Sequence, residues 1–238
     1  MRIGVLGTGI VGNTIGSTLV ANGHDVCMGS RSATNPKAAA WARACGAAGH
    51  RGRATHGTFA DAAAFGEVLF NCTAGAASLD ALQAAGHENL RDRILIDVSN
   101  PLDFSKGMPP SLVICNTDSL GERIQAAFPE ARVVKTLNTI NCQVMVAPHR
   151  LPGDHVIFLS GNDPAAKQTV ARLLDEWFGW EEGNIVDLGD ITTARGPEMM
   201  LPLWVRLMFA LGSADFNFNL VRAEPRPRAA REAINAVH

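Results

Sequence analysis

The chain opens on a short apolar run that breaks into three spaced glycines. Residues 3–6 read Ile-Gly-Val-Leu, and Gly7, Gly9 and Gly12 follow in the spacing G-x-G-x-x-G. Apolar residues at helical spacing continue over residues 11–21. A strand, a glycine turn and a helix in this order indicate dinucleotide binding, because the N-terminus of the helix then points free N–H groups at a pyrophosphate.

Each glycine of the turn has a distinct expected role. Gly7 permits the tight turn, Gly9 lets the backbone approach the pyrophosphate, and Gly12 lets the helix pack closely on the strand. The residues expected to contact the cofactor here are Gly7, Thr8, Gly9, Ile10, Val11 and Gly12.

The end of the second expected strand, over residues 26–29, decides which dinucleotide binds. NAD enzymes place an acidic residue at this point to accept hydrogen bonds from the ribose. Here the position holds Ser30 and Arg31, whereas Asp25 lies at the opposite end of the strand. An arginine can pair with a 2′-phosphate, so the sequence predicts NADP(H), unless Arg31 is an ordinary exposed arginine. The residues expected around this phosphate are Ser30, Arg31, Ser32, Thr34 and Lys37.

Apolar runs alternate with helical segments along most of the chain. The expected strands cover residues 67–73, 93–99, 132–138, 155–160 and 184–189, and residues 111–115 are ambiguous. The expected helices cover residues 36–48, 58–64, 77–85, 120–127 and 164–178. This alternation is typical of parallel strands buried on both faces. It predicts a doubly wound, mostly parallel α/β sheet of the NAD(P)-binding Rossmann type over residues 1–190, with a short C-terminal helical segment over residues 191–238.

Composition limits the other classes of function. The 238 residues carry a net charge of −2, which gives no electrostatic case for nucleic acid or an anionic membrane. No apolar run is long enough to span a bilayer, and Met1 leads directly into the first strand rather than into a signal peptide. We therefore expect a cytoplasmic protein with reduced thiols that acts on a small-molecule redox substrate. The C-terminal arginines expected to be solvated are Arg222, Arg226, Arg228 and Arg231.

Tyrosine, cysteine and histidine give no sign of a catalytic or metal-binding motif in this sequence. The chain has no tyrosine, which excludes the Tyr-x-x-x-Lys chemistry of short-chain dehydrogenases, and no metal-ligand spacing, so no metal is expected. Cys27, Cys72 and Cys142 are expected on strands as small core residues. The seven histidines are expected at the surface or at helix ends, with the role of His149 left open because it follows a strand that should reach the ligand-facing edge.

Residues that directly follow the strands are the remaining site candidates, because ligands of such sheets bind at the carboxyl ends of the strands, where the strand order reverses. Small residues at 73–76 suit a loop against the nicotinamide ribose, or form a plain turn. Asn138 and Asn141 could orient the nicotinamide carboxamide or simply tie off the backbone. The full set is Thr73, Ala74, Gly75, Ala76, Asn100, Pro101, Asn138, Thr139 and Asn141.

One further motif lies near the C-terminus. Residues 195–203 read Arg-Gly-Pro-Glu-Met-Met-Leu-Pro-Leu. Together with the glycine turn, the Gly-Ser-Arg end of the second strand and residues 133–139, this motif resembles the NADP-dependent reductases of the deazaflavin coenzyme F420, in which Arg-x-x-Glu-x-x-x-Pro-Leu opens a C-terminal helix. The resemblance covers nearly the whole chain. The chain departs from the family pattern at Asn138 and Asn141, where the family has His and Pro, and it lacks an aromatic residue after Gly75.

The resemblance implies direct hydride transfer between nicotinamide and a flat redox ring such as coenzyme F420 or a flavin. Catalysis would then be mostly positioning, with no acid or base and with Asn138, Thr139 and Met200 placing the reactants. The resemblance also implies a homodimer formed through the C-terminal helices, with the segment around Phe216 and Phe218 wrapping the partner subunit. The helical stripe that would form either an acceptor wall or a core and dimer interface is Met199, Met200, Leu203, Trp204 and Leu207.

Two other functions stay open at this point. An NADPH-dependent imine or carbonyl reductase would need an acid near the nicotinamide, and Glu198 or Lys135 would be the place to look. Lys135, in the middle of its strand, could equally be a paired or snorkelling lysine. The third function is a non-catalytic NADPH-sensing protein. The related hydroxyacid dehydrogenases carry a longer helical domain than 238 residues allow.

Overall fold

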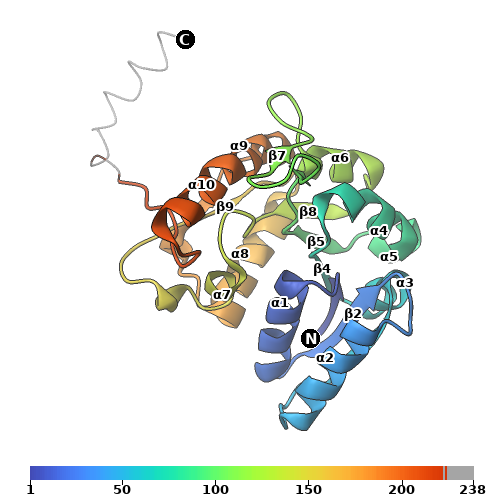
Figure 1. Ribbon diagram of the computed structural model, residues 1–238. Coiled ribbons are helices and arrows are strands. Elements are labelled where there is room, and N and C mark those ends of the chain that lie inside the picture. The colour runs from blue at the N-terminus through green and yellow to red at the C-terminus, as the bar shows by residue number, and fades with distance from the viewer. Residues whose placement is uncertain (222, 224–238) are drawn as a thin grey trace.

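A six-stranded parallel sheet forms the centre of the computed structural model, which describes residues 1–221 and 223 (Figure 1). The strand order is β3-β2-β1-β4-β5-β8. The strands are β1 (Arg2–Leu6), β2 (Asp25–Ser30), β3 (Ala54–Thr58), β4 (Val68–Asn71), β5 (Ile94–Asp97) and β8 (Arg132–Lys135). The order reverses between β1 and β4, so the doubly wound fold predicted from the sequence is confirmed, and this reversal marks the expected ligand edge.

Helices cover both faces of the sheet (Figure 1). They are α1 (Ile10–Ala21), α2 (Pro36–Ala47), α3 (Phe59–Phe65), α4 (Ser78–Ala85), α5 (His87–Leu90), α6 (Leu120–Ala127), α7 (Cys142–Met145), α8 (Pro164–Phe178), α9 (Arg195–Met199) and α10 (Leu201–Leu211). Five predicted helices match α2, α3, α4, α6 and α8 with ends displaced by at most one residue.

Alternation along the strands divides the core in two. Ile3 and Val5 of β1 face one side, where they join residues of α1, α2, α7 and α8. Leu6 faces the other side, with residues of α3, α4, α5 and α6. Every second side chain of a strand points to the same face, so a strand covered on both sides must be apolar throughout. This is why the apolar runs predicted the parallel strands correctly.

Two small strand pairs accompany the central sheet. β9 (Ile157–Leu159) and β10 (Ile185–Asp187) pair in parallel, and an antiparallel bridge from Lys135 to Ser160 joins them to β8. β6 (Leu102–Asp103) and β7 (Ser111–Leu112) form an antiparallel hairpin directly after β5. The sequence left the region of β7 ambiguous, because strands of two residues carry too little periodicity to be recognised.

The C-terminal helical segment is broken rather than continuous. α9 ends at Met199, and α10 begins at Leu201 with a proline in its first turn. After α10 the chain returns to β9, where Val156 N donates a hydrogen bond to Phe218 O at 2.9 Å, and the Phe216 ring stacks on Trp204 with 5.3 Å between centroids. The predicted domain boundary after residue 190 stays a prediction. The arginines predicted to be solvated (Arg222, Arg226, Arg228 and Arg231) lie outside the described residues.

Three predictions about single residues need correction. Cys142 does not lie on a strand but begins α7, and Cys72 is half-buried just beyond the end of β4. His155 is not a surface residue but is 8% exposed. It is buried because both ring nitrogens have partners, the carbonyl oxygen of Pro148 at 3.0 Å and the side-chain amide of Asn217 at 2.9 Å. Among the described residues, no helix is long and apolar enough to cross a membrane.

Candidate functional site

The turn after β1 requires two of its glycines for reasons internal to the protein. Gly7 has a φ of +120°, and a Cβ there would lie 2.6 Å from the carbonyl oxygen of Cys72. A Cβ on Gly12 would overlap the carbonyl oxygen of Gly7. The turn is further held by the Gly7 N–H, which donates to the Gly29 carbonyl at 3.0 Å. The first and third glycines thus let α1, β1 and β4 approach one another.

Gly9 is different, because nothing in the protein requires a glycine there. Its φ of −74° is open to any residue, and no heavy atom lies within 4 Å of an ideal Cβ at this position. Gly9 is the N-cap of α1 and provides no side chain to satisfy the first N–H groups of the helix. These free N–H groups and the open space before them fit the pyrophosphate of a dinucleotide.

The end of β2 presents Arg31 to solvent. Ser30 is buried, and its hydroxyl donates to the carbonyl oxygen of Ser32 at 2.7 Å, which fixes the turn. Ser32 and Thr34 pair through their hydroxyl groups at 3.0 Å. Arg31 is exposed and has no ion pair with any other residue that the structure describes. Its guanidinium is therefore available for an external anion.

Two hollows flank the N-terminus of α1. The first, which we call the α1–α2 hollow, has a volume of about 470 Å³ and is lined by Thr8, Gly9, Ile10, Asn13, Lys37, Ala40, Trp41 and Ala44. The second, which we call the hairpin hollow, has a volume of about 400 Å³ and is lined by Val11, Cys72, Thr73, Ala74, Gly75, Ala76, Val98, Ser99, Asn100, Leu102, Asp103, Phe104 and Val113. Most of the residues predicted to contact the cofactor thus line one hollow or the other.

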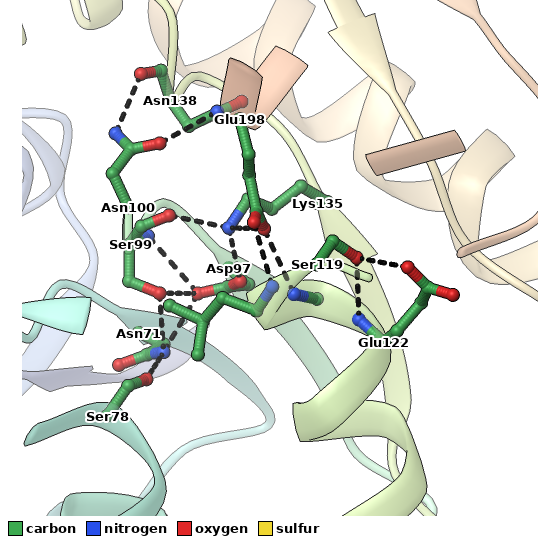
Figure 2. Close-up of polar contacts among 12 residues, drawn as sticks. Asn71, Ser78, Asp97, Ser99, Asn100, Ser119, Glu122, Lys135, Asn138 and Glu198 are labelled. Atoms are coloured by element: carbon green, nitrogen blue, oxygen red, sulfur yellow. Dashed lines mark hydrogen bonds and ion pairs between the residues drawn. The ribbon is translucent and has the colours of Figure 1, made fainter. Parts of the chain in front are cut away.

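A buried ion cluster lies where β5, β8 and α9 meet (Figure 2). Lys135 Nζ lies 2.8 Å from Asp97 Oδ2 and 2.8 Å from Glu198 Oε1, and all three side chains are at most 1% exposed. Burial opposes the charged form of Lys135, but the two carboxylates raise its pKa, so the ammonium group stays charged. Lys135 is therefore the paired lysine that was one of the two predicted alternatives, and it does not snorkel.

The ion cluster continues toward the hairpin hollow. Lys135 Nζ also donates to the carbonyl oxygen of Ser99 at 2.5 Å, and the Ser99 hydroxyl donates to Asp97 Oδ1 at 2.6 Å. The amide of Asn71 donates to the same Asp97 oxygen at 2.8 Å, and its carbonyl accepts from the Thr73 hydroxyl at 2.7 Å. Because these groups are buried and paired, they fix the loops after β4 and β5 relative to each other.

Asn138 and Asn100 hold each other across the sheet edge (Figure 2). The Asn138 side-chain amide donates to Asn100 Oδ1 at 2.9 Å, and the Asn100 amide donates to the backbone oxygen of Asn138 at 2.9 Å. The preceding residue, Leu137, is buried with a φ of +60°, so the chain turns sharply after β8. Asn138 and the neighbouring Thr139 are buried, and only Asn100 of the pair lines the hollow.

The Asn141 side chain binds a backbone N–H group, which is the second of the two roles predicted for it. Its side-chain oxygen caps α7 by accepting from Gln143 N at 3.2 Å, and its amide donates to Asp215 at 3.3 Å. The role of the C-terminal stripe, as acceptor wall or as core and dimer interface, stays a prediction. Met200 is half-buried, Leu203 is 53% exposed, and neither lines the hairpin hollow, where the β6–β7 hairpin forms the outer wall instead.

The hairpin hollow holds no group suited to donate a proton among the described residues. Glu198 and Lys135 are sealed beneath it. Asp103 lines it, but hydrogen bonds from the backbone and side chain of Ser105 lower the pKa of its carboxyl. Burial raises the pKa of the Cys72 thiol, which therefore stays protonated and is no nucleophile. His149 is exposed in the turn Pro148–Arg150 and lines neither hollow.

The sheet order and the open glycine turn are those of a dinucleotide-binding protein. Comparison with known proteins gives the family. The model of the coenzyme F420-dependent NADP oxidoreductases matches residues 2–101. A crystal structure of a candidate F420-dependent NADP-reductase from Arthrobacter sp. FB24 is 51% identical, covers 93% of this chain and 100% of that chain, and superimposes with a TM-score of 0.84. The chain belongs to this family of NADP-dependent oxidoreductases.

Two more distant proteins are also similar to this chain, one in sequence and one in fold. The metalloreductase STEAP3 of Rattus norvegicus is 27% identical over 95% of this chain, and the chain spans only 43% of the length of that protein. A reductive aminase from Aspergillus terreus in complex with NADPH and ethyl levulinate has a TM-score of 0.61 at 20% identity, with 88% of this chain and 62% of that chain covered. This second likeness shows the fold alone.

Proposed function

We propose that this protein transfers a hydride between NADP(H) and a flat redox ring, and that the deazaflavin coenzyme F420 is its preferred partner in this transfer. The 51% identity to the Arthrobacter protein over the full length of that chain supports this proposal most directly. The hairpin hollow combines apolar side chains such as Val11, Phe104 and Val113 with a few polar ones, a lining that is consistent with an aromatic ring as its occupant.

The chain's own residues would hold the cofactor in three places. The N-terminus of α1 behind Gly9 would bind the pyrophosphate, and Arg31 with Ser32 and Lys37 would surround the 2′-phosphate. Thr73 to Gly75 and Asn100 would lie against the nicotinamide end, because they line the hairpin hollow on the other side of α1. When bound there, the cofactor supplies the hydride, and the protein orients it and excludes water.

The absence of a suitable proton donor among the described lining residues favours a ring acceptor over an imine or carbonyl. Reduction of a carbonyl or imine is helped by an acid within hydrogen-bond reach of the reacting atom. Both predicted acids, Glu198 and Lys135, are engaged in the buried ion cluster and are at most 1% exposed. Catalysis by positioning alone is adequate for hydride transfer between two stacked rings.

The proposal is tested by following NADPH oxidation optically with four acceptors, namely the deazaflavin, riboflavin, a cyclic imine and a ketone. We expect turnover with the deazaflavin and little turnover with riboflavin, the cyclic imine or the ketone. Turnover with the imine or ketone alone would replace the proposed function by the reductase alternative. NADPH binding without turnover of any acceptor would favour the sensing protein.

A further inference from the structure

The β6–β7 hairpin forms the outer wall of the hairpin hollow. Leu102 and Asp103 of its first strand, Phe104 directly after that strand and Val113 after its second strand line the hollow, together with the turn at 73–76 and Val11 of α1. No motif in the sequence pointed to this segment. It follows β5, which pairs with β4, the strand at the reversal of strand order.

The base of the hairpin is fixed to the site. Leu102 N donates to Asn100 O at 2.8 Å and Val113 N donates to Pro101 O at 2.9 Å. Gly75 packs so closely on Asn100 that a Cβ there would overlap the Asn100 carbonyl. Because Asn100 is itself held by Asn138, the base of the hairpin and the loop after β4 keep a defined position relative to each other.

A tight turn closes the tip of the hairpin, and the chain that leaves it contacts α9. Gly107, with a φ of +85°, donates its N–H to Phe104 O at 2.9 Å and closes the tip. After β7, Asn116 N contacts the sulfur of Met199 in α9 at 3.3 Å. The hairpin is therefore closed by its own tip and held to the rest of the protein at its base, through Asn100 and Pro101 before β6 and through Asn116 after β7.

Large apolar side chains of this hairpin are exposed. Phe104 is 57%, Met108 is 55% and Val113 is 53% exposed. Phe104 and Val113 line the hollow, whereas Met108 does not. Exposed apolar groups that rim a concave site mark the place where a ligand covers them. A volume of about 400 Å³ is within the range of small-molecule sites.

We infer that Phe104 and Val113 form the face against which the acceptor ring lies, and that they determine acceptor specificity in favour of flat aromatic rings. This inference rests on the proposed function, since it names the wall of the same site. An aromatic side chain gains from stacking on a flat ring and gains little from a small carbonyl compound. The nicotinamide would occupy the opposite wall, so substitutions in the hairpin should leave NADPH binding unchanged.

The test measures binding separately from turnover. Oxidised deazaflavin F420, and riboflavin in parallel, are titrated into protein saturated with NADP⁺, a pair that cannot react because both partners are oxidised. Fluorescence of the ring reports binding. The variants are Phe104→Ala, Val113→Ala and Phe104→Trp, and Met108→Ala is the matched control on the same hairpin with nearly equal exposure. The dissociation constant for NADPH checks that each variant is folded.

We expect Phe104→Ala to raise the dissociation constant of the ring by roughly three- to tenfold. Val113→Ala should raise it less, and Phe104→Trp and Met108→Ala should leave it within twofold of the unmodified protein. The inference is overturned if neither ring binds the unmodified protein, if Phe104→Ala binds normally, or if Met108→Ala loses as much. Turnover is scored apart: a ring that binds through Phe104 without accepting hydride would overturn the proposed function and leave the hairpin face standing.

Discussion

Lys135 and Glu198 form a fully buried ion pair, with 2.8 Å between Nζ and Oε1, that joins the central sheet to the C-terminal helices. The same carboxylate accepts hydrogen bonds from Leu120 N at 2.8 Å and Gly121 N at 3.0 Å, so it also caps α6. With Asp97 on its other side, Lys135 balances one of two carboxylates, and the positive end of α6 compensates part of the second. One side chain of α9 thus fixes three elements around the site.

Removing the ammonium group should therefore destabilise the fold strongly. Lys135→Met leaves two buried carboxylates without the cation that balances them, and we expect a loss of about 3–5 kcal/mol in the free energy of unfolding, measured by urea denaturation. The control is Arg132→Met on the same strand, whose ion pair with Asp163 is at 3.6 Å and half exposed. It should change stability by less than about 1 kcal/mol. Equal effects of the two variants would contradict a special role of the buried cluster.

Arg31 should discriminate between the two nicotinamide cofactors. Arg31→Ala removes the guanidinium proposed to pair with the 2′-phosphate, and we expect NADPH binding to weaken by roughly 10- to 100-fold while NADH binding changes little. Titration calorimetry with both cofactors measures this difference. Arg43→Ala, on the exposed face of α2, is the matched control and should affect neither. A parallel loss for NADPH and NADH would rule out the phosphate role.

Asn138 should act on turnover through Asn100. Asn138→Ala frees Asn100 Oδ1 from its partner, so we expect a lower kcat at unchanged NADPH affinity, together with about 1 kcal/mol less stability. Asn141→Ala removes the N-cap of α7 and should cost about the same stability. Steady-state kinetics separates them, because only the first variant should lose turnover. If both keep full kcat, the pair at the sheet edge is merely structural.

Local patterns predicted the fold and the glycine turn because each depends on neighbours in the sequence. The apolar runs of β1, β4, β5 and β8 follow from burial on both faces, and the five matched helices follow from spacing and from N-caps such as Asn35 and Asp163. β3 was not identified by its residues, since Ala-Thr-His-Gly-Thr is mostly half-buried at the sheet edge and has no apolar run.

Other parts of the site depend on contacts between distant residues. Lys135 pairs with Asp97 and Glu198, and no periodicity in the sequence links positions so far apart. The turn after β8 depends on Leu137 adopting a positive φ, a conformation that a leucine rarely takes and that its sequence neighbours do not signal. The hairpin wall was missed because its strands have only two residues each.

The contrast between Gly9 and Gly12 gives the sharpest test of the dinucleotide site. Both belong to the same motif, but a Cβ on Gly12 would overlap the Gly7 carbonyl, whereas a Cβ on Gly9 would meet nothing. Gly9→Val should therefore leave the melting temperature nearly unchanged while it abolishes NADPH binding, because the side chain fills the space before the free N–H groups of α1. Gly12→Val should instead lower stability by more than about 2 kcal/mol, because the helix must move away from the turn. Thermal denaturation and NADPH titration of both variants separate the two roles. If the Gly9→Val protein still binds NADPH tightly, the pyrophosphate does not bind at the N-terminus of α1.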